Sequence, residues 1–192
     1  MLNAPNLLSL GRILLVPLLV VALLTKFQGK EYVALGLFLV AALTDFLDGY
    51  LARRRQQVTR LGQLLDPAAD KILMSAAFIS LVEMGTVPSW MVVVIIAREF
   101  AVSALRSIAA ADNHIIAAGW SGKVKTTVHI VAISVCIIHE RLADLGKPAD
   151  LTWLVPVVLW AAVAISVISG LEYFVRHANV FLRSAGGSAD RG

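Results

Sequence analysis

The chain has 192 residues, of which 58% are hydrophobic, and its mean hydropathy is +0.79. Soluble globular domains contain about 45–50% apolar residues, so this composition argues against an ordinary soluble protein. The formal net charge of +4 does not indicate a nucleic-acid partner, because most basic residues lie beside apolar segments, as on the cytoplasmic face of membrane proteins.

Six apolar segments follow one another along the chain, each close to the roughly 17–25 residues that cross a bilayer. Backbone groups in hydrocarbon must be hydrogen-bonded internally, so we predict an all-α integral membrane protein with six transmembrane helices, at residues 7–24, 33–52, 67–85, 89–110, 122–139 and 152–175. Gly62 and Pro67 are expected to break the chain before the third segment. No polar linker divides the chain, so we expect one domain over 1–183 and a disordered Gly/Ser-rich tail over 184–192.

The basic residues between the segments predict the orientation. The loop after the second segment carries arginines at positions 53, 54, 55 and 60, and further basic residues open the fifth segment and follow the sixth. The loops on the other side carry fewer. By the positive-inside rule, the 53–60 loop, the 111–122 loop and both termini are expected to lie in the cytoplasm.

Four aspartates lie where the second and third segments approach the cytoplasmic face. Asp45 and Asp48 are three residues apart near the end of the second segment, and Asp66 and Asp70 are four apart at the start of the third. Each spacing places two side chains on one helix face, and acidic residues inside membrane segments are costly and usually functional. Four carboxylates brought together need cations between them. Their oxygen ligands suit Mg²⁺ or Mn²⁺, and two such ions are typical of phosphoryl chemistry.

The residues around the aspartates favour a phosphate ligand. Gly49 and Ala52 present no bulky side chain, so a flat ligand is able to approach the helix backbone. Arg53, at the membrane edge, is placed to meet a phosphate. The alternative is that the aspartates form helix-end salt bridges with Arg53, Arg60 and Lys71, which the combined spacing makes the weaker interpretation.

Residues 45–70, DFLDGYLARRRQQVTRLGQLLDPAAD, resemble the CDP-alcohol phosphatidyltransferase family. They match its signature D-x2-D-G-x2-A-R-x8-G-x3-D-x3-D at every defined position, and six membrane helices over this length are similar as well. The resemblance implies that Asp45, Asp48 and Asp66 bind the metals, while Asp70 contacts metal and acts as the general base.

The same resemblance implies a nucleotide site. Asp45, Gly49, Arg53 and the Thr59 hydroxyl would bind the CDP-diacylglycerol. The stretch PNLLSLGR, over residues 5–12, is similar to the N-terminal element of the family, which places Asn6 and Ser9 near the nucleotide. The family also implies a homodimer.

Basic residues inside or beside the later segments are candidates for an acceptor phosphate site, and they are Arg98, Arg106, Lys123, Lys125 and Arg176. Arg98 and Arg106 lie about 80° apart around a helix, within one broad face. The alternatives are cytoplasmic-edge charges, a packing pair of Arg98 with Glu99, and an i,i+4 pair of Glu172 with Arg176.

Two further stretches narrow the choice of acceptor alcohol by their resemblance to known sequences. AREFAVSALR, over 97–106, and GKVKTTVHI, over 122–130, are similar to segments of bacterial phosphatidylglycerophosphate synthases, with His129 where glutamine is expected. This implies transfer of phosphatidyl from CDP-diacylglycerol to glycerol 3-phosphate by a multi-pass enzyme of the bacterial inner membrane, with its active site facing the cytoplasm. Inositol phosphate, serine or phosphatidylglycerol are alternative acceptors. A membrane prenyltransferase and a small cation transporter are alternatives from other classes.

Overall fold

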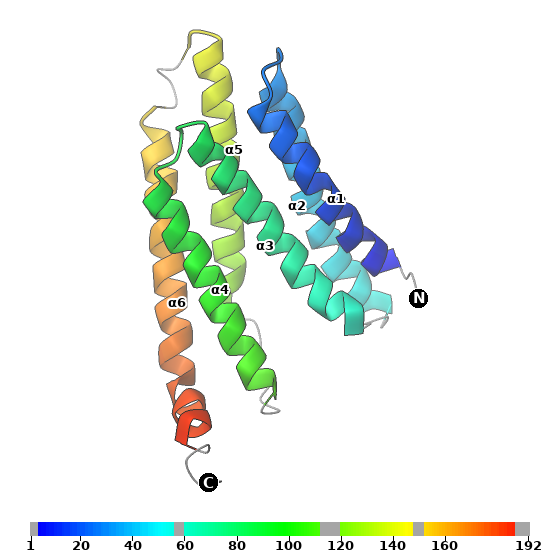
Figure 1. Ribbon diagram of the computed structural model, residues 1–192, viewed down its shortest axis with the longest axis vertical. Coiled ribbons are helices and arrows are strands. Elements are labelled where there is room, and N and C mark those ends of the chain that lie inside the picture. The colour runs from blue at the N-terminus through cyan, green and yellow to red at the C-terminus, as the bar shows by residue number, and fades with distance from the viewer. Residues whose placement is uncertain (1–3, 56–59, 112–119, 148–151, 187–192) are drawn as a thin grey trace.

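The computed structural model describes residues 4–55, 60–111, 120–147 and 152–186 (Figure 1). These residues form six helices and no strand, in the predicted order. The helices are α1 (Ala4–Leu24), α2 (Lys30–Arg55), α3 (Arg60–Glu83), α4 (Ser89–Ala111), α5 (Trp120–Asp144) and α6 (Leu154–Gly186). The predicted all-α class and the six helical segments are therefore confirmed.

The helices pack in two groups. Helix α1 lies against α2 and α3, while α6 lies against α4 and α5; the groups meet where α5 contacts α2 and α3, and where α4 contacts α3 (Figure 1). The start of α1, the end of α2, the start of α3 and the end of α6 lie towards the lower end of the molecule in Figure 1. The aspartate-bearing parts of α2 and α3 thus occupy one end of the bundle, away from the α1–α2 and α3–α4 turns.

The turns at the upper end are built on glycines with a left-handed backbone. Gly85 has φ +81° after α3, and Gly146 has φ +70° after α5. After α3, the Gly85 N–H donates to the Val82 carbonyl at 2.9 Å and the Thr86 N–H donates to the Leu81 carbonyl at 3.0 Å. This is the Schellman pattern, which satisfies the last carbonyls of a helix and favours glycine at the left-handed position.

The expected break at Gly62 and Pro67 is wrong. Helix α3 begins at Arg60 and contains Pro67 within it. Proline removes one backbone hydrogen bond, but in a helix among other helices that loss is tolerated because neighbouring groups satisfy the freed carbonyl. Asp66 and Asp70 therefore lie on one continuous helix. At the other end of the chain, α6 runs to Gly186 and so covers the start of the predicted tail over 184–192.

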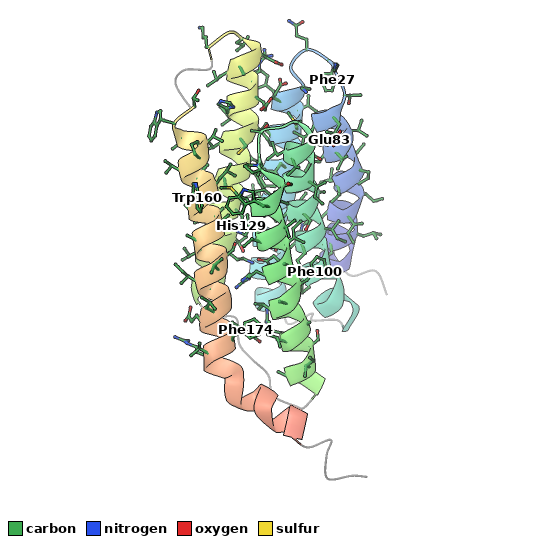
Figure 2. The ribbon with its side chains drawn as sticks, turned by 60° about the vertical axis from the view of Figure 1, so that its left-hand side comes forward. Phe27, Glu83, Phe100, His129, Trp160 and Phe174 are labelled. Atoms are coloured by element: carbon green, nitrogen blue, oxygen red, sulfur yellow. The ribbon has the colours of Figure 1, made fainter. Side chains whose placement is uncertain are left out.

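The bundle has an apolar core and an apolar outside. Buried side chains such as Leu19, Phe38, Phe78 and Ile133 fill the interior. Many large apolar side chains project outward (Figure 2), including Leu14, Val93, Phe100, Ile168 and Val175, each more than 60% exposed. In the described part, Val124–Asp144 and Leu154–Arg176 are long and apolar enough to cross a membrane, by length and composition.

Candidate active site

The acidic residues of the signature lie on two helices that contact each other. Asp45 and Asp48 lie one turn apart in the last part of α2, and Asp66 and Asp70 lie one turn apart on α3. Because both helices are continuous through these positions, the i,i+3 and i,i+4 spacings place each pair on one helix face. Side chains are described for Asp70 but not for the other three.

The remaining nucleotide-site residues are only partly described. Gly49 and Arg53 lie on α2 and Asn6 lies on α1, with no side-chain description, and Thr59 lies outside the described residues. Ser9, on α1, is fully buried. Arg12 lies one turn further along α1 and is 1% exposed. A buried guanidinium requires compensating polar partners, so Arg12 is a polar residue of the interior to which the sequence analysis assigned no role.

A cavity opens between α3, α4 and α5 beside Asp70. Phe78, Ile95 and Ile96 contribute apolar walls, and its polar lining includes Asp70, Lys71, Glu99, Lys125, Thr126 and His129. The general-base candidate and one acceptor-site candidate, Lys125, thus line the same cavity.

Glu99 joins two of the predicted basic residues at this cavity. Its Oε1 accepts a hydrogen bond from Arg98 Nη1 at 3.1 Å and another from Lys125 Nζ. The side chain of Arg98 is 13% exposed, that of Lys125 is 11% exposed and that of Glu99 is 16% exposed. We call this group the Glu99 trio. Two cations share one carboxylate, so the trio carries a formal excess of one positive charge at a largely buried position, which suits an anionic ligand.

The other predicted acceptor residues lie elsewhere. Arg106 is exposed, about two turns beyond Arg98 on α4. The Arg176 side chain is 69% exposed and its Nη2 lies 3.0 Å from Glu172 Oε1, four residues earlier. The side chain of Lys123 lies outside those described. The structure therefore brings Arg98 and Lys125 together, and it contains both pairs that the alternative interpretation expected, Arg98 with Glu99 and Arg176 with Glu172.

His129 is a cavity residue to which the sequence analysis assigned no role. It is 2% exposed, its Nε2 lies 2.8 Å from Ser166 Oγ, and its ring meets Phe78 edge-on at 5.7 Å between centroids. Figure 2 shows it inside the bundle. The only sequence signal was its departure from the expected glutamine. Its position one turn beyond Lys125 on α5 places it deeper along the same wall.

The chain is similar to known proteins over most of its length. A family model described as CDP-alcohol phosphatidyltransferase matches residues 2–168. The chain is 41% identical over 191 residues to the CDP-diacylglycerol–glycerol-3-phosphate 3-phosphatidyltransferase of Bacillus subtilis, covering 92% of this chain and 96% of that one. It is 36% identical over 188 residues to a probable phosphatidylglycerophosphate synthase of Mycobacterium tuberculosis, covering 96% and 84%. A Rickettsia felis protein with the same name as the Bacillus relative is 33% identical over 172 residues, covering 90% and 93%.

Proposed function

Since this chain belongs to the CDP-alcohol phosphatidyltransferase family, we propose that it transfers the phosphatidyl group from CDP-diacylglycerol to glycerol 3-phosphate. The products are phosphatidylglycerol phosphate and CMP, and the chain is a transferase of phospholipid biosynthesis. The observation that carries the acceptor assignment is the cavity lined by Asp70 together with Glu99 and Lys125 of the positively charged trio, while Arg98 is hydrogen-bonded to Glu99. A general base beside a cationic group suits an acceptor that carries both a hydroxyl and a phosphate.

The donor set suits divalent metal ions, which enzymes of this family generally use. Four aspartates on two contacting helices supply oxygen ligands only, which is the preference of Mg²⁺ and Mn²⁺. In the proposal, Asp45, Asp48, Asp66 and Asp70 bind two ions. Such ions would neutralise the diphosphate of the donor and stabilise CMP as the leaving group.

The donor nucleotide is assigned to the lower ends of α1 and α2. Asp45, Gly49, Arg53 and Thr59 would bind the CDP moiety, with Asn6 and Ser9 beside it. The support is that the members of this set on α1 and α2 lie at one end of the bundle, where α1 packs on α2 and α3 and where the polar Ser9 is buried. The acyl chains would remain in lipid against the exposed apolar side chains.

The acceptor is assigned to the cavity. The trio residues Arg98 and Lys125 would bind its phosphate, with Arg106, Lys123 and Arg176 as further predicted contacts from the sequence. Asp70 accepts the proton of the C1 hydroxyl. That oxygen attacks the phosphorus that carries the diacylglycerol, and the bond from this phosphorus to the oxygen of CMP breaks.

The chain is proposed to span the bacterial inner membrane six times, with both termini and the active site on the cytoplasmic side. The apolar outer surface, the two helices able to cross a membrane and the bacterial relatives support a membrane protein. The start of α1 and the end of α6 both lie towards the end of the bundle that carries the aspartates (Figure 1), and an even number of crossings would place the two on one side of the membrane. The homodimer stays a prediction from the family resemblance.

The test is an acceptor comparison with purified protein in detergent. CMP release is measured with CDP-diacylglycerol, Mg²⁺ and, in separate reactions, glycerol 3-phosphate, inositol phosphate, serine or phosphatidylglycerol. We expect turnover with glycerol 3-phosphate and its loss on adding a chelator. Preference for inositol phosphate would overturn the acceptor while preserving the reaction class. Serine carries no phosphate to match the trio, and a cation transporter would release no CMP at all.

A further inference from the structure

A glycine on α6 makes room for the arginine of the Glu99 trio. Gly170 is buried where α6 packs against α4. A Cβ atom added at this position would lie 3.0 Å from Arg98 Cγ, 3.6 Å from its Nε and 3.9 Å from its Cδ. Carbon atoms pack best at about 3.5–4.0 Å. Any side chain larger than hydrogen therefore pushes the stem of Arg98 away from α6.

The position of that stem decides whether Arg98 reaches Glu99. The two residues are adjacent on α4, so their side chains leave the helix about 100° apart, yet Arg98 Nη1 donates to Glu99 Oε1 at 3.1 Å. The Arg98 stem lies beside Gly170 of α6 while its Nη1 reaches Glu99. Its Nε is buried and has no hydrogen-bond partner among the described residues. No hydrogen bond at Nε fixes the stem, so the space left by Gly170 sets how close the stem lies to α6.

We propose that Gly170 is a positioning residue for the acceptor phosphate site. The absence of a side chain at 170 allows Arg98 to lie against α6 and hold Glu99, which in turn holds Lys125 at the cavity wall. This inference rests on the proposed function, because it assigns the trio to binding glycerol 3-phosphate. It adds a residue that touches neither substrate and that acts only through Arg98.

The test compares two glycine-to-alanine variants. Gly170→Ala adds the crowded Cβ, whereas Gly36→Ala adds a Cβ that meets nothing within 4 Å on α2. Both changes raise helix propensity by a similar amount. We expect Gly170→Ala to raise the KM for glycerol 3-phosphate about three- to tenfold, less than the roughly hundredfold that a misplacement of 1 Å costs. The KM for CDP-diacylglycerol, the kcat and the melting temperature should match those of Gly36→Ala.

A double-mutant cycle tests whether the effect passes through Arg98. Arg98→Ala removes the atoms that crowd position 170, so Gly170→Ala should then cause no further rise in KM. An equal rise in both backgrounds would overturn the proposal, because independent effects multiply. If Arg98→Ala is too slow to assay, the same four proteins are compared by calorimetric binding of glycerol 3-phosphate.

The outcomes separate this inference from the proposed function. Absence of CMP release by the wild type with glycerol 3-phosphate overturns the function. A wild type that uses glycerol 3-phosphate, with Gly170→Ala indistinguishable from Gly36→Ala, overturns only the role of Gly170. An unfolded Gly170→Ala protein also overturns it, because the glycine would then serve helix packing alone.

Discussion

Replacing Lys125 by methionine should weaken the use of glycerol 3-phosphate without affecting CDP-diacylglycerol. Methionine keeps an unbranched stem of similar length but removes the ammonium, so the formal charge of the Glu99 trio falls from +1 to 0. The Lys125 side chain is 11% exposed, so water has little access to this position and would not compensate for the lost ammonium. A hydrogen bond to a charged group contributes about 1.5–3 kcal/mol. We therefore expect kcat/KM for glycerol 3-phosphate to fall about ten- to a hundredfold.

The assay is CMP release at varied concentrations of each substrate, with two controls. Lys125→Arg keeps the charge and should retain most activity, which separates charge from loss of packing. Lys147→Met removes an exposed lysine after the end of α5 and should leave both KM values unchanged. Equal losses for both substrates in Lys125→Met, or a similar loss in Lys147→Met, would refute the assignment of Lys125 to the acceptor side.

Three further outcomes test other parts of the molecule. Asp70→Asn should lower CMP release by about 10²–10⁴-fold, as expected for loss of a general base, with an unchanged gel-filtration profile; near-normal turnover would exclude this role. Arg141→Gln should lower the free energy of unfolding by about 1–3 kcal/mol, because the Glu31 side chain is 3% exposed and its Oε2 lies 3.7 Å from Arg141 Nη1. Denaturation in detergent measures this loss, and a change in either KM would contradict a purely structural role for Arg141. A cysteine at Gln57 should react with a membrane-impermeant reagent only from the cytoplasmic side, and one at Lys147 only from outside; the reverse pattern would invert the proposed topology.

The sequence alone determined the acidic half of the site, because each pair of aspartates lies within a few residues on one helix. Asp45 with Asp48, and Asp66 with Asp70, are paired by helix geometry alone, and any continuous helix places them on one face. The six helices and their order followed from the length of the apolar segments for the same reason. The helix boundaries did not, since α3 passes through Gly62 and Pro67. A glycine costs a helix interior about 1 kcal/mol and a proline about 3 kcal/mol, which the packing of α3 against α1 and α2 is able to outweigh.

The tertiary structure alone decided how the basic side of the cavity is built. Lys125 lies 26 residues from Glu99 along the chain, and Ser166 lies 37 residues from His129. Gly170 meets Arg98 across the α4–α6 contact. Such contacts depend on the rotation of each helix about its axis and on the fit of one helix surface against another. Apolar periodicity in membrane segments does not encode these quantities, because lipid-facing and core-facing positions are apolar alike.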